Sequence, residues 1–351
     1  MNSWNLIKSK PAFIKLLNWE YWPAKMFYLP MWVYLPYLQL RSGHPCFFTA
    51  TNPGIETGGL GLESKFDTIK SIPDSLKPRT VFAPKGIAFD QVEKQLHQEG
   101  IEYPIIAKPD IGYRGLLVKK IESPEALRSY FDKYPIDIIL QEFIQGLDEF
   151  GVLYYRFPWE KSGRISSLTL KDFLHVTGDG ISSVRELIIA KPRASLQLER
   201  LEQTQKELLN TIPAKGNRIP LGVIGNHSKG THFINGNKHI DEQLVKTFDQ
   251  ITSQIDGLYY GRYDLKCSSL EALKEGKDIV IIEINGVCSE PTHIYDSQKT
   301  SYLRALRDIL KHWNIIYKIS KANRKRGIDC MPTKEMIQRF WHLNKYIKKL
   351  G

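Results

Sequence analysis

The sequence has few of the features that mark secreted, zinc-binding or membrane-spanning proteins. Its four cysteines lie far apart, with no Cys-x-x-Cys pair and no Cys/His ligand spacing, which excludes a structural zinc site and favours free thiols in a reducing compartment. The uncharged run at 26–40 has 15 residues and contains Pro30 and Pro36, whereas a membrane-spanning helix needs about 20 apolar residues. No small-residue cleavage site follows this run, so we do not expect a signal peptide.

Positive charge is concentrated at the two ends of the chain. Of the net charge of +11, residues 1–44 carry +4 and residues 301–351 carry +10, so residues 45–300 carry −3. The N-terminal segment also interleaves tryptophans with lysines, a composition that suits a membrane interface. The same composition suits a proline-broken strap that buries its aromatic rings on the main domain. The sequence leaves both interpretations open.

Acidic and amide side chains interrupt two β-like runs, 258–265 and 279–284. Because side chains alternate along a strand, Glu283 and Asn285 point to the same face. If the two runs pair as a hairpin, Asp264 can face them. Two carboxylates and an amide oxygen are hard ligands, suited to Mg²⁺ that arrives with a nucleotide phosphate. The alternative is that all three are solvated residues at strand ends.

A second candidate site follows an apolar strand predicted at 104–108. Lys108 closes this strand, and a loop containing Gly112 and Gly115 leads to another strand at 116–121. A lysine in this place can reach a phosphate, and the N–H groups of the loop can fold over the same phosphate. No Gly-Lys-Ser/Thr opens a helix here, so the Walker pattern is absent. An ordinary β-hairpin is the alternative.

A third candidate follows the apolar run at 136–140. Glu142, Phe143 and Ile144 form a backbone hinge that can present N–H and C=O groups to an adenine edge. Glu149, seven residues beyond Glu142, can accept hydrogen bonds from both hydroxyls of a ribose. The alternative is a pair of surface glutamates at strand ends.

Taken in chain order, these motifs resemble those of ATP-grasp carboxylate–amine ligases. The segments that carry the resemblance are Lys65, KPDIGYRG at 108–115, QEFIQGLDEF at 141–150, GRYDL at 261–265 and EIN at 283–285. The block at 261–291 is similar to D-alanine–D-alanine ligases. VTGDGISSVRELI at 176–188 and GNHSKGTHFING at 225–236 are similar to segments of cyanophycin synthetases. The resemblance covers residues 60–315, and five motifs in the same order are more specific than any one of them.

The resemblance implies an α+β fold of the ATP-grasp type, in which two α/β subdomains grip ATP. The expected parts are an aromatic N-terminal segment at 1–60, a nucleotide-binding subdomain at 61–145, a catalytic subdomain at 146–315 and a basic helical extension at 316–351. The family's usual N-terminal domain of roughly 100 residues has no counterpart before Lys65. That domain helps to shape the substrate site, so the substrates cannot be carried over from the relatives.

The resemblance also implies a role for each matching residue. The phosphates of ATP would be contacted by Lys65, Lys108 and the loop residues Gly112, Arg114 and Gly115. Adenine would be held by Glu142, Phe143 and Ile144, the ribose by Glu149, and one or two Mg²⁺ (or Mn²⁺) by Asp264, Glu283 and Asn285. Arg262 would neutralise an acyl-phosphate, and Lys229 would either place a cation near the γ-phosphate or face solvent.

The implied activity is the ATP-dependent joining of a carboxylate, small or lipid-linked, to an amine. Two alternatives remain open: a phosphotransferase that forms no new amide, and a non-catalytic nucleotide-binding protein at a membrane surface. The basic cluster KANRKRG at 321–327 is accompanied by no recognised nucleic-acid module, so nucleic acid is not an expected partner. The expected location is the cytoplasm, with peripheral contact to an anionic membrane. The sequence does not indicate an oligomeric state.

Overall fold

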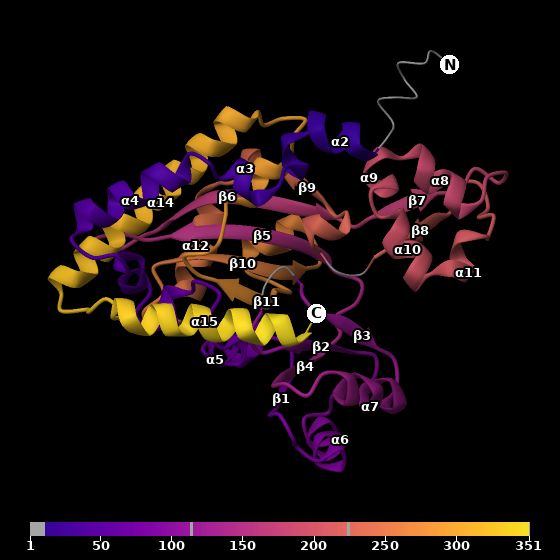
Figure 1. Cartoon of the computed structure of the whole chain (residues 1–351), viewed down its shortest axis with the longest axis horizontal. Coiled ribbons are helices and arrows are strands. Elements are labelled where there is room, and N and C mark those ends of the chain that lie inside the picture. The colour runs from indigo at the N-terminus through magenta and orange to yellow at the C-terminus, as the bar shows by residue number, and fades with distance from the viewer. Residues whose placement is uncertain (1–10, 113–114, 223–224, 351) are drawn as a thin grey trace.

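The computed structural model describes residues 11–112, 115–222 and 225–350. In these ranges the chain forms two large antiparallel sheets with helices on their faces, a small lobe that contains a two-stranded sheet, and helical segments at both ends (Figure 1). The α+β class with two subdomains, predicted from the sequence, is confirmed. Arg114, one of the predicted phosphate contacts, lies outside the described residues.

The four-stranded sheet belongs to the first subdomain and has the strand order β1-β4-β2-β3, with all neighbouring strands antiparallel. Its elements are β1 (Thr80–Ala83), α6 (Phe89–Gln98), β2 (Ile105–Pro109), β3 (Lys119–Ile121), α7 (Pro124–Lys133) and β4 (Ile138–Glu142). Val92 and Leu96 of α6, and Leu127 of α7, recur at helical spacing and are buried against the β-branched residues of the strands. α5 (Lys65–Lys70) precedes this sheet, and the Ser64 side chain caps its first turn.

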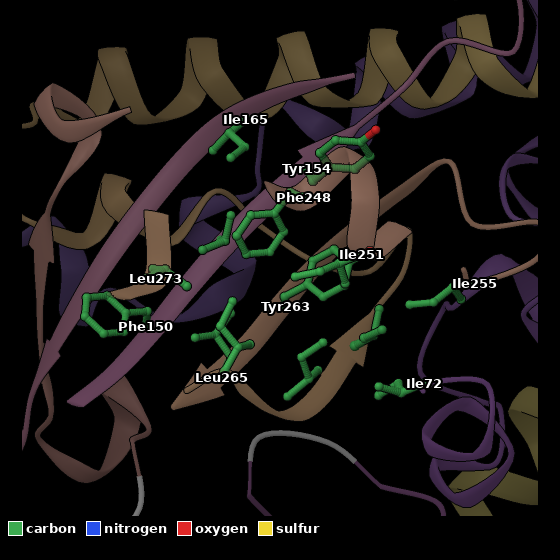
Figure 2. Close-up of a cluster of buried hydrophobic side chains, with 14 of the residues drawn as sticks. Ile72, Phe150, Tyr154, Ile165, Phe248, Ile251, Ile255, Tyr263, Leu265 and Leu273 are labelled. Carbon is green, nitrogen blue, oxygen red and sulfur yellow. The ribbon is translucent and has the colours of Figure 1, made fainter. Parts of the chain in front are cut away.

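The five-stranded sheet has the order β11-β10-β5-β6-β9. Its elements are β5 (Asp148–Tyr155), β6 (Arg164–Asp172), β9 (His232–Asn235), α12 (Glu242–Ser253), β10 (Tyr260–Cys267), α13 (Leu270–Glu275) and β11 (Val280–Asn285). Amphipathic α12 covers one face, where the rings of Phe248 and Tyr263 lie 5.2 Å apart between centroids (Figure 2). β10 and β11 pair antiparallel, as the sequence predicted, and α13 lies in the connection between them.

Strand β10 supplies both the core and a charged row. Tyr263 and Leu265 belong to the cluster under α12, whereas Arg262 and Asp264 alternate with them along the strand. Because side chains alternate between the faces of a sheet, these two charged residues point away from α12. The face of the sheet opposite α12 therefore carries these charged side chains.

A small lobe is inserted after β6 and has its own hydrophobic cluster. It consists of β7 (His175–Thr177), α8 (Val184–Ala190), α9 (Pro192–Ser195), α10 (Leu198–Thr204), α11 (Lys206–Leu209) and β8 (Arg218–Pro220). In Figure 1 it lies to the right of the five-stranded sheet. The VTGDG motif at 176–180 leads into α8, which begins with a capping box between Ser183 and Glu186.

The chain ends form helices that pack on the five-stranded subdomain. They are α2 (Pro11–Leu17), the 3₁₀ helix η1 (Trp19–Tyr21), α3 (Ala24–Phe27), α4 (Met31–Ser42), α14 (Tyr302–Lys325) and α15 (Thr333–Leu350). α4 lies along α14 (Figure 1). The expected boundary at residue 315 falls inside α14, which also takes up most of the basic cluster.

The N-terminal segment packs partly as a strap on the main domain, and its residues from α2 to α4 are called the strap below. Trp19 stacks on Phe27 with ring centroids 5.5 Å apart and donates a hydrogen bond from Nε1 to the carbonyl oxygen of Thr300. Trp22 packs against Tyr302, whereas Trp32 on α4 is 64% exposed. Among the described residues, no helix combines the length and the apolar character that crossing a bilayer requires.

Candidate active site

The two sheets, the strap and α15 enclose one cavity of about 1150 Å³. The residues singled out by their sequence motifs that line it are Lys65, Lys108, Gly112, Gly115, Glu142, Phe143, Ile144, Glu149, Arg262, Asp264, Glu283 and Asn285. Lys229 is not among its lining residues. Its Nζ donates a hydrogen bond of 3.2 Å to the carbonyl oxygen of Gly115, so Lys229 joins two loops beside the cavity.

Ion pairs organise the acidic residues of the cavity. Asp264 and Glu283 are direct cross-strand neighbours on β10 and β11. Lys65 Nζ lies 2.5 Å from Oε1 of Glu283, and Arg262 Nη2 lies 2.8 Å from Oδ2 of Asp264. Asn285 donates a hydrogen bond of 3.0 Å from Nδ2 to the same Oδ2 of Asp264. Opposite charges are therefore matched along this face.

Burial and neighbouring charge set the protonation of these groups. Burial opposes ionisation of Asp264, but the charges of Arg262 and Lys171 outweigh it and hold the pKa of that carboxyl well below its usual range. Burial likewise opposes ionisation of Glu283, and Lys65 and Lys108 lower its pKa in spite of it. Both acids are therefore ionised near neutral pH.

At Lys108 the effect of burial outweighs the effect of the neighbouring acid. Burial lowers the pKa of the Lys108 ammonium, the charge of Glu283 raises it, and the nearby charge of Lys65 lowers it. The net result is a pKa of about 8. A group of negative phosphate oxygens would restore the full charge of Lys108. This cation is therefore poised to respond to an anionic ligand.

Lys171, on β6, was missed in the sequence. Its Nζ lies 2.7 Å from Oε1 of Glu149 and 2.9 Å from Oδ1 of Asp264, and its side chain is only 4% exposed. Glu149 and Lys171 are register partners on β5 and β6. Lys171 lies within a strand, on the same face as buried Thr169, and this alternation is a signal that the sequence carries. Its partners could not be foreseen without the register.

The hinge after β4 is held by cationic side chains. Arg79 Nη2 lies 2.8 Å from Oε1 of Glu142, and the N–H of Glu142 donates to the carbonyl oxygen of Arg79. Lys266 Nζ donates a hydrogen bond of 2.7 Å to the carbonyl oxygen of Ile144 and lies over the Phe143 ring. The Glu142 side chain is thus engaged at the surface, which leaves the backbone of Phe143 and Ile144 as the part of the hinge that can meet a flat base.

Two glycines allow loops to approach the charged face closely. A Cβ at Gly225 would lie 2.2 Å from Oε1 of Glu149, so glycine lets the loop at 225–230 pass over that carboxylate without displacing its side chain. Gly59 adopts a φ of +84°, and a Cβ there would lie 2.4 Å from the Cα of Gly286. The glycine-rich passage before Lys65 is thereby held against the end of β11.

The strap closes one end of the cavity through a buried acid that no motif indicated. Glu20 Oε2 lies 2.7 Å from Arg193 Nη2 and 2.8 Å from His227 Nε2, and its Oε1 accepts a hydrogen bond of 2.6 Å from Ser297. Burial raises the pKa of Glu20, but the hydrogen bond with His227 and the charge of Arg193 outweigh it and lower the pKa to about 2. This cluster ties the strap to the lobe and to the loop at 225–230.

The acidic pair and Asn285 suit a divalent cation chemically. They offer two ionised carboxylates and an amide oxygen, the hard oxygen ligands that Mg²⁺ and Mn²⁺ accept. In the part of the chain that the structure describes, no three His, Cys, Asp or Glu side chains gather as a metal-binding group. A cation bound here would therefore need further oxygens from phosphate or water, as Mg²⁺ commonly has beside a nucleotide.

These features define an architecture of two antiparallel sheets around lysines, a hinge and paired carboxylates, and in this the chain resembles ATP-grasp ligases. No protein-family model matches the chain. It is similar to the glutathione biosynthesis bifunctional protein GshAB of Streptococcus mutans, with 24% identity over 266 residues that cover 67% of this chain and 33% of that protein.

Two solved structures are also similar. A bifunctional glutathione synthetase from Pasteurella multocida has 18% identity and a TM-score of 0.39, over 73% of this chain and 35% of that one. A D-alanine–D-alanine ligase from Bacillus anthracis has 13% identity and a TM-score of 0.42, over 78% and 72%. The chain thus spans about a third of the length of GshAB and of the Pasteurella protein.

Proposed function

We propose that the chain is an ATP-dependent ligase that activates a carboxylate as an acyl-phosphate and joins it to an amine. The observation that carries the proposal is that the residues of five separate motifs line a single cavity, where lysines lie close to an acidic pair. Making an amide from a carboxylate needs a leaving group, which ATP supplies, and the site must gather several negative oxygens.

Each side chain then has a defined task. The substrate carboxylate attacks the γ-phosphorus and ADP leaves; the amine attacks the acyl carbon and phosphate leaves, with loss of a proton from nitrogen. Lys65 and Lys108 bind the phosphates, and Arg262 stabilises the negative oxygens that develop at the acyl carbon. The backbone of Phe143 and Ile144 orients the base. No protein nucleophile is required.

Magnesium would be held by Asp264, Glu283 and Asn285, and it would supply positive charge against the phosphate oxygens. These three residues lie within two neighbouring strands, so their positions are fixed by the hairpin. Arg262 and Lys171 keep Asp264 ionised for this purpose.

Binding of Mg·ATP is expected to stabilise the folded protein by about 2.7 kcal/mol at a concentration near 100-fold its Kd. A thermal-shift measurement with and without Mg·ATP checks this. Lys108→Met removes a buried phosphate contact and should abolish the shift, whereas Lys94→Met, at an exposed position of α6, should leave it unchanged. Well-folded wild-type protein that shows no shift at millimolar Mg·ATP would contradict the proposal.

A phosphotransferase is the competing activity for the same site. It would release ADP in the presence of its acceptor alone, whereas a ligase needs an amine to complete turnover. A screen of candidate carboxylates for ADP release, with and without candidate amines, separates the two. ADP release that requires the amine supports the ligase, and ADP release with the acceptor alone supports the phosphotransferase.

We further propose that the enzyme contacts an anionic membrane peripherally, at the cytoplasmic face, where a lipid-linked substrate would lie. Trp32, Val33 and Leu40 of α4 are 64%, 77% and 85% exposed, and exposed Lys25 and Arg41 flank them. Apolar side chains can enter the headgroup region, and each nearby lysine or arginine adds about 1 kcal/mol with anionic lipid.

Vesicles test the membrane proposal. Wild-type protein should sediment with vesicles that contain phosphatidylserine and should be released at high salt. Val33→Glu should prevent sedimentation, whereas Ile181→Glu, the same change at an exposed position of the lobe, should not. Wild-type protein that stays in the supernatant throughout would leave only the strap role for this segment.

A further inference from the structure

A second cavity, of about 530 Å³, lies between α4 and α14. Met31 and Leu35 of α4, and Ile309 and Ile316 of α14, contribute to its largely apolar wall. Figure 1 shows the two helices side by side at the upper edge of the molecule. Its volume falls in the range of about 300–1,000 Å³ that is usual for small-molecule sites. This cavity is large enough for a ligand and has no part in the nucleotide chemistry.

The two cavities meet at a shared wall. Tyr28, Cys288 and Glu290 line both of them. The carbonyl oxygen of Glu290 accepts a hydrogen bond of 3.5 Å from Nη1 of Arg262, the cation assigned to the reacting acyl group. The apolar cavity therefore borders the proposed site of reaction, with Glu290 in the wall between them.

Glu290 differs from the other acids of the site. Glu20, Glu149, Asp264 and Glu283 each form an ion pair with a lysine or arginine. In the described ranges, Glu290 forms no ion pair, and its Oε2 accepts a hydrogen bond of 2.5 Å from the Tyr295 hydroxyl. Burial raises the pKa of the Glu290 carboxyl to about 7. A buried carboxylate without a counter-ion is stabilised by a cationic ligand.

The rest of the wall narrows the choice of ligand. No lysine or arginine is among the described residues that line the apolar cavity, so a carboxylate there would meet an acid and no cation. The ring of His312 is turned to the Tyr260 hydroxyl, 3.0 Å from its Nδ1. An amine that carries an apolar chain suits both the acid and the apolar wall, because its ammonium pairs with Glu290 and its chain is removed from water.

We propose that the cavity between α4 and α14 binds the apolar chain of the amine substrate and that Glu290 holds its amino group beside the reaction site. This inference rests on the proposed ligase function and adds the class of the amine: an alkyl or aryl amine, and not a small polar amino acid. Tyr28 contributes to both walls, so the strap takes part in selecting this substrate.

Calorimetric titration without nucleotide tests the proposal independently of ATP binding. The probes are octylamine and octanoate below their micelle concentrations, and octan-1-ol below its solubility limit. Wild-type protein should bind octylamine saturably, octan-1-ol about tenfold more weakly, and octanoate not at all. Glu290→Gln should reduce octylamine to the affinity of octan-1-ol. Equal binding of octylamine and octanoate would overturn the assignment of an amine.

Cavity-filling variants locate the binding. Leu35→Trp, and Gln39→Trp at another half-buried position of the same wall, should weaken octylamine by about tenfold or more. Val33→Trp makes a comparable change at an exposed position of α4 and should bind octylamine as the wild type does. Octylamine binding that survives both filling variants, in folded protein, would overturn the site. Mg·ATP stabilisation in the same variants reports separately on the ligase proposal.

An alkyl amine could reach the cavity either from water or from a bilayer. Phosphatidylcholine vesicles that contain octadecylamine present the amine as a lipid, and octylamine presents it in solution. Binding from either source that is lost in Leu35→Trp supports the cavity. The proposal is overturned if Leu35→Trp still binds the amine from both sources, or if the wild-type protein binds it from neither.

Discussion

Replacing Glu283 by Gln is expected to abolish the Mg²⁺-dependent part of the stabilisation by ATP and to lower turnover by about 10³-fold. The substitution keeps the shape of the side chain but removes one of the two carboxylate charges of the proposed ion site. It also leaves Lys65 and Lys108 without their acidic neighbour. ATP alone should therefore still bind, because the lysines remain. Unfolding temperatures with ATP plus Mg²⁺, and with ATP plus a chelator, should become equal in the variant.

The matched control for this change is Glu275→Gln. Glu275 ends α13, in the same hairpin connection, and its carboxylate pairs with Lys277 at the surface. It should keep the wild-type response to Mg²⁺ and the wild-type turnover. A Glu283→Gln protein that retains the difference between ATP with and without Mg²⁺ would show that this glutamate does not hold the ion.

Replacing Lys171 by Met is expected to destabilise the fold by about 3–5 kcal/mol. Lys171 is the only cation paired with Glu149 within the described residues, and it also contacts Asp264. Removing it leaves a carboxylate largely buried without a counter-ion, which costs more than the ion pair itself contributes. Asp264 keeps Arg262, so the loss falls mainly on Glu149. Urea denaturation of the two proteins measures the difference.

Lys277→Met is the control for the loss of a lysine. Lys277 also pairs with a glutamate, but its side chain is 70% exposed, so water screens the interaction and no measurable change is expected. Raising the pH cannot replace this mutation as a test. Burial lowers the pKa of Lys171, but the charges of Asp264 and Glu149 outweigh burial and raise the pKa above its usual value, so the lysine stays charged as the pH rises. A Lys171→Met protein as stable as the wild type would contradict the structural role assigned to this ion pair.

Much of the site follows from local sequence pattern. The alternation of side chains in a strand placed Glu283 and Asn285 together, and the hairpin brought Asp264 directly opposite Glu283. The hinge at Glu142 and the loop after Lys108 were recognisable because each lies within one turn or strand end. These features need contacts only between neighbouring elements, so a single sequence carries enough information to predict them.

The rest depends on contacts that no local pattern encodes. The uncharged run at 26–40 was compatible with a strap and with a membrane surface, and α4 has both a packed face and an exposed one. The apolar cavity exists because α4 and α14 meet without filling the space between them. The basic cluster at 321–327 lies largely within α14, which continues to Lys325, since lysine and arginine are good helix formers and suit a helix C-terminus.

The Glu20 cluster also constrains when the molecule can assemble. Its partners Arg193, His227 and Ser297 follow Glu20 by 173, 207 and 277 residues. During synthesis at about 5–20 residues per second, the strap therefore waits roughly 15–60 s before its last partner has been made. Contacts of such long sequence separation form late and slowly. Until then, the aromatic rings of this segment lack their partners on the nascent chain, and unburied apolar surface of this kind favours aggregation.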